Sequence, residues 1–272
     1  MRRSFNRSFR PVCRLAGPVL AAAILLAGCA GTPKTAEDAD DPYAPNDPIE
    51  NVNRQIFEFN LALDRYVLKP TAQAYRWALP EFARNGVRNF LYNLSSPLIL
   101  ANDALQANGE RAGTTFARFW INSILGFGGV QDVATGLGIQ YHDEDYGQTL
   151  AVWGVPEGPY LMLPVFGPSN PRDTAGLGAT FVSDPFTLGM NAAGLDYIPY
   201  IRSVTSAVDT RSRNIELFDQ IERTSLDYYA TVRSLYRQRR AAEIRNDDAA
   251  AAGAGAPAPA LTPTPATPQR SP

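Results

Sequence analysis

The sequence predicts an all-α protein, and three observations indicate this fold class. Apolar residues recur at steps of three and four over residues 49–67, helix-start signals precede the apolar segments, and prolines and glycines separate those segments. Of the 272 residues, 45% are hydrophobic, which suffices for one domain with a sizeable core. We therefore expect a compact arrangement of amphipathic helices with Gly/Pro-rich connections.

The N-terminus has the pattern of a bacterial lipoprotein signal. Five arginines precede an apolar run that ends in Leu26-Ala27-Gly28-Cys29, which matches a lipobox. The sequence predicts a signal peptide at residues 1–28, cleavage before Cys29 and lipidation of Cys29. An ordinary signal peptide with an incidental cysteine, or an uncleaved anchor, is the alternative interpretation. Ala30, where an Asp would retain a lipoprotein at the inner membrane, favours the outer membrane.

Cysteine content and charge exclude two classes of protein. Cys13 leaves with the signal and Cys29 would carry lipid, so the mature chain cannot form an internal disulfide. The full chain has a net charge of −2, and loss of the five signal arginines brings the mature chain near −7. An acidic chain without a long basic stripe binds nucleic acid poorly. We expect no nucleic-acid partner.

The mature chain is expected to begin with a tether and an amphipathic helix. Residues 29–46 are small, polar and acidic, which predicts a flexible segment after the lipid. The body, residues 47–245, opens with Asp47-Pro48-Ile49-Glu50, a helix-start signal. Pro70 is expected to stop or kink this first helix. Its inward face is predicted to consist of Ile49, Val52, Ile56, Phe59, Leu63 and Val67.

Four further helices are expected in the first half of the body. They are predicted at 71–79, from Pro80 to about Pro97, at 97–106, and from Asn108 or Gly109 through Leu125. The second of them should turn five residues inward: Phe82, Val87, Phe90, Leu91 and Leu94. The aromatic stripe Phe116, Phe119 and Trp120 is interpreted as core rather than as a binding site.

The second half is divided by composition. From 126 to 201, glycine and proline interrupt short apolar stretches, which predicts short helices, turns and a hairpin. Residues 200–245 are charged and permissive for helices, and the Ala/Pro-rich segment 246–272 is predicted to be disordered. The apolar, Gly/Pro-broken stretch 147–168 would suit a membrane interface, with its irregular backbone turned toward protein or water.

No catalytic or metal-binding pattern is complete. His142 is the only histidine and stands in an acidic run, but the ligand spacing of a calcium loop and the second histidine of a helical zinc motif are missing. We interpret this run as a solvated loop whose histidine caps or pairs locally. A Gly-x-Ser-x-Gly motif is also missing. We expect no catalytic residue, metal or cofactor.

Several motifs, taken in order, resemble the VacJ/MlaA-type outer-membrane lipoproteins from about Asp41 to Tyr236. They are Asn53-Arg54 with Phe57 and Asn60, Phe119-Trp120-Ile121-Asn122-Ser123, Gly126-Phe127-Gly128-Gly129, Asp132-Val133-Ala134, Gly147-Gln148-Thr149-Leu150, Trp153-Gly154-Val155, Gly158-Pro159-Tyr160, Leu163-Pro164, Gly167-Pro168-Ser169 and Arg172-Asp173. The resemblance implies a ring-like helical body in the inner leaflet of the outer membrane, lipid-anchored and facing the periplasm.

The resemblance also implies a function and partners. Such a protein removes mislocalised phospholipid from the outer leaflet through an amphipathic channel, associates with a trimeric porin and passes lipid to a periplasmic carrier of an inner-membrane ABC system. Gly154, Gly158 and Tyr160 would belong to a loop beside the channel, with hinges at the two glycines because Pro156 stiffens the loop. The alternatives are a structural lipoprotein scaffold for porins and a membrane-tethered lipid hydrolase.

Overall fold

The computed structural model describes residues 46–248, so Cys29, the signal peptide, most of the tether and nearly all of the tail lie outside the described residues. The chain divides after Glu50 into two units, and the second, from Asn51 onward, contains the folded body. The helices of the first half are α2 (Glu50–Leu63), the π-helix η3 (Asp64–Leu68), α3 (Lys69–Ala78), α4 (Glu81–Leu105) and α5 (Gly109–Ile124).

The second half has shorter elements and one small sheet. Its helices are α6 (Val133–Gly136), α7 (Tyr146–Val152), α8 (Pro171–Ser183), α9 (Pro185–Ala192), α10 (Ile198–Arg213), α11 (Ile215–Thr224) and α12 (Tyr228–Ile244). Strands β1 (Leu161–Leu163) and β2 (Gly167–Ser169) pair antiparallel as a hairpin, with Met162 opposite Pro168. The all-α prediction is confirmed, and so is the hairpin.

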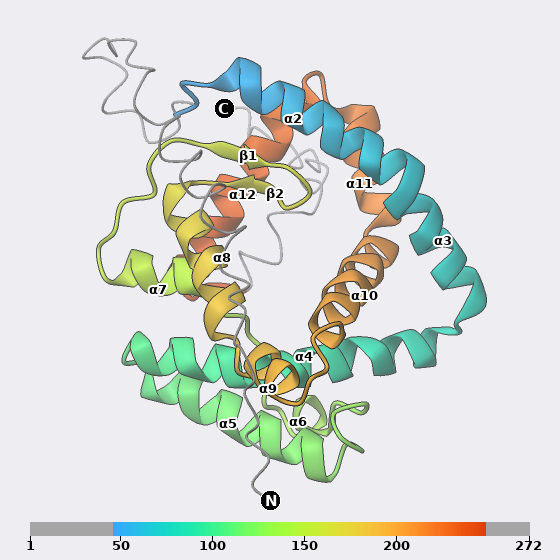
Figure 1. Ribbon diagram of the computed structural model, residues 1–272, viewed down its shortest axis with the longest axis vertical. Coiled ribbons are helices and arrows are strands. Elements are labelled where there is room, and N and C mark those ends of the chain that lie inside the picture. The colour runs from blue at the N-terminus through green and yellow to red at the C-terminus, as the bar shows by residue number, and fades with distance from the viewer. Residues whose placement is uncertain (1–45, 249–272) are drawn as a thin grey trace, which may run out of the picture. The chain divides into compact units, whose positions relative to one another are not determined.

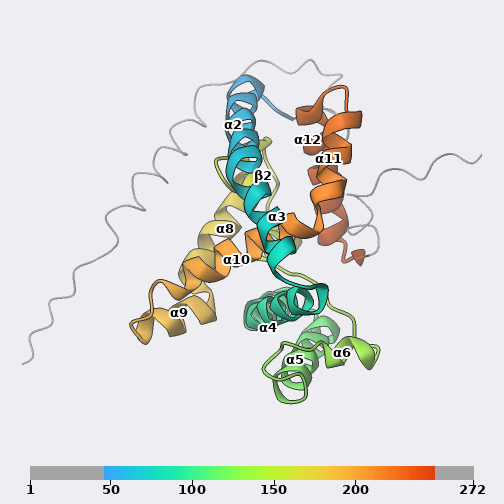
Figure 2. The same cartoon turned by 90° about the vertical axis from the view of Figure 1, so that its right-hand side faces the viewer.

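The helices of the second unit form a closed circuit. Helix α4 contacts α10, α10 contacts α11, α11 contacts α12, α12 contacts α7, and α7 returns to α4 (Figure 1). Helix α5 packs along α4, α8 packs on α7, and α3 packs on α10. Figure 2 shows α2 and α11 running beside each other on opposite sides of a gap. This circuit is the ring-like arrangement that the family resemblance implied.

The chain stays helical at two prolines where the prediction placed a helix boundary. Pro70 does not stop the first helix: η3 precedes it with a wider turn, in which the amide of Lys69 bonds the carbonyl of Asp64, and the chain stays helical. Pro97 does not end a helix either, because it lies inside the 25-residue α4. The two separate helices expected on either side of Pro97 are one.

The prediction of which faces point inward is wrong for α2 and α5 and only partly right for α4. In α2 the buried residues are Asn53 and Phe57, whereas Val52 and Phe59 are 49% and 53% exposed. In α4, Leu91 is buried, but Phe82 is 79% exposed. In α5 the buried residues are Thr115, Arg118 and Asn122, and the aromatic stripe interpreted as core lies on the exposed or half-exposed side.

The reason is that this body buries mainly polar side chains and exposes many apolar ones, the reverse of a water-soluble domain. Among the described residues, 12 hydrophobic and 20 polar or charged side chains are buried, while 31 large hydrophobic side chains are exposed. On water-soluble domains, large exposed apolar patches are rare and mark sites of interaction with proteins or membranes. Periodicity identified the apolar stripes correctly, but the assumption that an apolar stripe faces a core does not hold here.

The polar interior is hydrogen-bonded. His142 is buried, and its Nε2 lies 3.2 Å from both oxygens of Asp103 and 3.1 Å from Oγ1 of Thr115. The Thr115 hydroxyl donates to Asp103 at 2.6 Å, so its proton does not point at the histidine. The expectation of a solvated loop is therefore wrong: His142 pairs with a residue on α4, 39 positions away.

Glu144 gives the fold a pH dependence. Its side chain is 2% exposed, and burial raises its pKa from 4.5 to about 7, while Gln106 at 2.7 Å and Arg111 partly offset that effect. Because the folded pKa lies above the unfolded one, the stabilisation by proton uptake is full below about pH 4.5 and is lost as pH rises through 7.

We predict that Glu144→Gln raises the free energy of unfolding by about 2–3 kcal/mol at pH 8 and hardly changes it at pH 4.5. Thermal unfolding of detergent-solubilised protein across that range measures the difference. Parallel curves for wild type and variant at all pH values would contradict the buried-carboxylate account.

Candidate functional site

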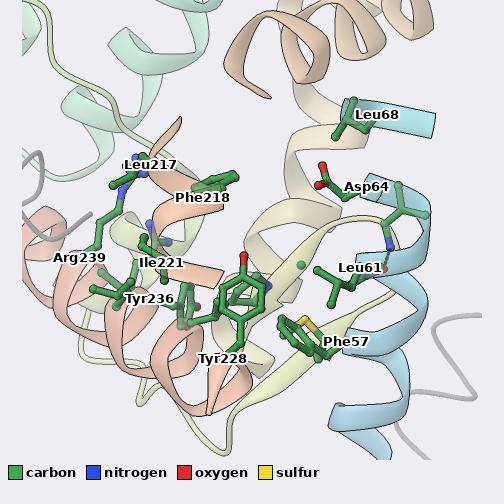
Figure 3. A pocket seen from close by; sticks show the side chains of 18 of the residues that line it. Phe57, Leu61, Asp64, Leu68, Leu217, Phe218, Ile221, Tyr228, Tyr236 and Arg239 are labelled. Atoms are coloured by element: carbon green, nitrogen blue, oxygen red, sulfur yellow. Dashed lines mark hydrogen bonds between the residues drawn. The ribbon is translucent and has the colours of Figure 1, made fainter. Parts of the chain in front are cut away.

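The candidate site is an apolar cavity of about 560 Å³ between α2, the hairpin, α11 and α12 (Figure 3). This volume lies within the range of about 300–1,000 Å³ for small-molecule sites. Its walls are Phe57, Leu61, Leu68, Met162, Val165, Pro168, Leu217, Phe218, Ile221, Tyr228, Val232, Leu235 and Tyr236. Asn60, Asp64, Arg239, Arg240 and Glu243 add polar groups. The cavity therefore combines hydrocarbon walls with charged groups.

Two asparagines of α2 hold the hairpin in place. Asn53 donates to the carbonyl of Tyr160 at 3.0 Å and accepts from the amide of Met162 at 2.9 Å. Asn60 repeats the arrangement two turns later, with Leu163 at 2.9 Å and Val165 at 2.7 Å. Each side-chain amide thus satisfies one donor and one acceptor of the hairpin backbone, as a neighbouring strand would.

Two other residues of the same motif join α2 to α12. Phe57 packs edge-on against Tyr228 and Tyr229, with ring centroids 5.3 and 5.6 Å apart. Arg54 forms two hydrogen bonds to Asp227, at 3.2 and 2.6 Å, and these are the main reason that the pKa of Asp227 falls to about 2. Asp227 also caps the N-terminus of α12, so the salt bridge fixes where that helix begins.

Arg240 ties three elements together at the charged part of the cavity. Its guanidinium bonds Asp145 at 2.7 Å, Asp173 at 2.8 Å and Glu243 at 3.1 Å. Burial alone would raise the pKa of Asp173, but hydrogen bonds from Arg240 and Tyr236 lower it. Asp145 and Asn170 cap α7 and α8, so Arg240 connects α12 to the starts of both helices.

Two glycines make this packing possible. A Cβ on Gly147 would lie 2.6 Å from Oδ1 of Asp173 and closer still to Nη2 of Arg240. A Cβ on Gly176 would lie 2.9 Å from Cα of Gly147. The Gly-Gln-Thr-Leu motif therefore contains glycine because α7 and α8 approach each other at this position.

None of the three predicted loop residues lines the cavity. Gly154 and Gly158 have φ angles of +88° and +73° at either end of the segment between α7 and β1. Tyr160 is 3% exposed and packs in the core with Phe57, Met162 and Tyr229. The hinge role of the glycines stays a prediction.

Several site residues were not predicted from the sequence. The segment 200–245 was interpreted only as charged and permissive for helices, and it contains the cavity residues Phe218, Ile221, Arg239, Arg240 and Glu243. The motif residues Asn53, Phe57 and Asn60 were noted for their resemblance to a family, without a role. A signal was present: polar residues at positions 53 and 60 on a helix are two turns apart and so share a face.

The arrangement suits binding of an amphiphile, because the apolar walls of the cavity adjoin charged groups. Within residues 46–248, no group of three or more His, Cys, Asp or Glu side chains is placed to hold a metal ion. Over the same residues no helix is both long and apolar enough to cross a membrane. The fold and the cavity define a class: a helical body with an apolar exterior, a polar interior and a cavity for a molecule that is largely hydrocarbon.

Comparison with known proteins identifies the family. A family model described as MlaA lipoprotein matches residues 45–243. A protein of Escherichia coli K12 named "Intermembrane phospholipid transport system lipoprotein MlaA" is 34% identical over 223 residues, which are 79% of this chain and 82% of that protein. An uncharacterized protein of Rickettsia bellii is 36% identical over 200 residues, covering 73% and 77%.

A solved structure is also similar to this chain. It comes from work on the structural basis for maintenance of bacterial outer membrane lipid asymmetry, superposes with a TM-score of 0.65 at 34% identity, and is matched over 73% of this chain and 98% of the other. The chain belongs to the MlaA lipoprotein family.

Proposed function

We propose that this protein is an outer-membrane lipoprotein that removes mislocalised phospholipid from the outer leaflet and so maintains lipid asymmetry. The names of its relatives from Shigella flexneri and Escherichia coli support phospholipid transport between membranes. The observation that carries the proposal is the reversed polarity of the body together with its apolar cavity. Exposed apolar side chains are stable against hydrocarbon, and the cavity offers an acyl chain an apolar environment.

The transport itself requires no bond making. A phospholipid that leaves a leaflet must move a charged head past hydrocarbon, which costs several kcal/mol or more without polar partners. Asp64, Arg239 and Glu243 supply polar groups next to the apolar walls of the cavity. The cavity would thus bind the hydrocarbon of one molecule at its apolar walls and the charged head of that molecule at the adjacent polar groups.

Cys29 is proposed as the anchor, lipidated after cleavage of residues 1–28, which leaves the body facing the periplasm. Several acyl chains on one cysteine would make attachment effectively permanent, since each buried methylene contributes about 0.8 kcal/mol. Mass spectrometry of the mature N-terminus measures the modification. An unmodified Cys29 on protein recovered from cells would exclude the lipoprotein assignment.

The proposed partners follow from the family resemblance. They are a trimeric porin in the outer membrane and a soluble periplasmic carrier that delivers lipid to an inner-membrane ABC system. Exposed aromatic residues of α5, such as Phe116 and Trp120, would serve either a lipid or a protein neighbour.

Gly154 and Gly158 provide a test of loop motion. Both have positive φ, where a side chain costs about 1–2 kcal/mol per residue, and a Cβ at Gly158 would lie 3.1 Å from Pro171. We predict that replacing both with Ala impairs removal of surface phospholipid while protein amount and localisation stay near normal. A double variant that is abundant, correctly localised and fully active would rule out the hinge.

The function is tested in cells that lack the gene. We expect such cells to accumulate phospholipid in the outer leaflet, measured by accessibility to an added phospholipase, and expect the wild-type gene to reverse it. If the protein only scaffolds porins, porin binding is lost without any change in surface phospholipid. If it is a lipid hydrolase, the purified protein releases fatty acid from phospholipid.

A further inference from the structure

Two arginines of α4 form no ion pair with a described carboxylate, whereas other arginines nearby do. Arg84 and Arg88 are half-buried, and the Nε of each is buried without a hydrogen-bond partner. Neither guanidinium forms an ion pair with any described residue. Residues four apart on a helix lie on the same face, so the two positive charges are neighbours.

Two nearby carboxylates are already occupied, whereas Glu81, three positions before Arg84, forms no ion pair with a described residue. Asp209 of α10 accepts two hydrogen bonds from Arg213, at 2.8 and 2.9 Å, and one from the hydroxyl of Tyr75 at 3.1 Å. Glu216 of α11 binds Arg76 at 2.6 Å. Arg213 also donates to the backbone carbonyl of Arg84 at 3.0 Å, which fixes that turn of α4 against α10.

A half-buried charge without a counter-ion is costly, and two adjacent charges of the same sign increase the cost. An anion between them would remove it. Arg84, though not Arg88, lines an open polar pocket of about 190 Å³, whose other lining residues are Arg76, Glu81, Asn85, Ser212, Arg213 and Glu216. Guanidinium groups bind phosphate oxygens in a forked geometry, which makes phosphate the anion that this arrangement fits best.

The pocket and the lipid cavity are lined by consecutive residues of α11. Glu216 borders the pocket and Leu217, the next residue of α11, borders the cavity. The carboxylate of Glu81, at the start of α4, also lines the pocket. A head with a phosphate and an ammonium group would match the arginines and this carboxylate respectively.

We propose that Arg84 and Arg88 bind the phosphate of a phospholipid headgroup, at a site separate from the apolar cavity. The assignment of the phosphate to a lipid rests on the proposed function. The binding of a phosphate group itself rests on the two unpaired arginines.

The first test is binding by the full-length protein in a non-ionic detergent. The probe is dihexanoyl phosphatidylethanolamine below its micelle concentration, measured by calorimetry, with inorganic phosphate as the second probe. Arg84→Gln combined with Arg88→Gln should weaken binding of the short lipid by about tenfold or more, the loss expected for charge-assisted hydrogen bonds.

The control has the same charge change. Arg223 and Arg245 are exposed, and Arg223→Gln with Arg245→Gln should bind like wild type. Without ligand, the α4 double variant should unfold at a temperature no lower than wild type, because it loses uncompensated charge. If it fails to fold, Arg84→Gln alone is measured against the same criterion. Unchanged lipid binding by the α4 variant overturns the proposal. Equal binding of inorganic phosphate and lipid overturns the assignment to a headgroup.

A complementation experiment separates the two proposals. If the wild-type gene does not restore a low level of surface phospholipid in deletion cells, the proposed function fails. If the wild-type gene restores it and the α4 double variant restores it equally well, the headgroup site fails while the proposed function stands. We expect the double variant to restore it only in part, with normal protein levels.

Discussion

Arg240→Met is expected to lower the free energy of unfolding by about 3–5 kcal/mol, the cost of removing one partner from a buried ion-pair network. Arg240 is 7% exposed, and its removal leaves the largely buried Asp173 without its main cation and releases Asp145, which caps α7. The expected result is separation of α12 from α7 and α8, with loss of the cavity. Denaturant or thermal unfolding in detergent measures it.

The neighbouring arginine is the control. Arg239 is 63% exposed at its side chain and pairs with Glu243 at 2.7 Å, so Arg239→Met should cost about 1 kcal/mol or less. The pH dependence adds a second criterion. An unpaired Asp173 is protonated more readily, so the deficit of Arg240→Met should shrink as pH falls toward 4. Equal losses for the two variants would contradict the account of Arg240.

Asn53→Leu is expected to detach the hairpin from α2. Asn53 is 1% exposed, and leucine has a similar size but leaves the carbonyl of Tyr160 and the amide of Met162 without their partner. Each buried group left unpaired costs about 1–3 kcal/mol. Unfolding experiments should show that loss, and limited proteolysis should show faster cleavage near residues 161–169.

Asn60→Leu removes the same pair of bonds at a more open position, where Val165 is 66% exposed and water can replace the side chain. We therefore expect a smaller loss of stability for this variant. A variant Asn53→Leu that is as stable as Asn60→Leu would show that the hairpin does not depend on α2.

The sequence predicted the helices well but not their orientation. The start of a helix at Asn108 or Gly109, the start of another at Pro80 and the hairpin were predicted correctly because local signals decide them. The orientation of Val52, Phe59 and the α5 aromatics was missed, because periodicity shows that one face is apolar and not which medium it contacts. The lipidated N-terminus, which the sequence also predicted, was the available hint that this medium is hydrocarbon.

The cavity could not be predicted because its walls come from distant parts of the chain. Phe57 and Tyr228 meet only after α2 and α12 are brought together by the Arg54–Asp227 salt bridge, across 173 positions. The role of Arg240 could not be predicted either, since a charged residue in a charged helix gives no sign that three carboxylates surround it. The motif residues were recognisable, but their joint role in supporting a hairpin is visible only in three dimensions.

The most direct test of lipid transport through the cavity is to block the cavity reversibly with a label attached at position 221. This side chain lines the cavity, and the sequence contains only two other cysteines, Cys13 in the predicted signal and Cys29 at the predicted lipidation site (Figure 3). Ile221→Cys would be labelled in cells with a bulky thiosulfonate and then released with a reductant. Leu226→Cys, at an exposed position outside the cavity, is the control.

We predict that labelling Ile221→Cys raises phospholipid in the outer leaflet toward the level of deletion cells and that reduction lowers it again, while the labelled control stays at the wild-type level. A fully labelled Ile221→Cys protein that keeps the outer leaflet free of phospholipid would contradict transport through this cavity.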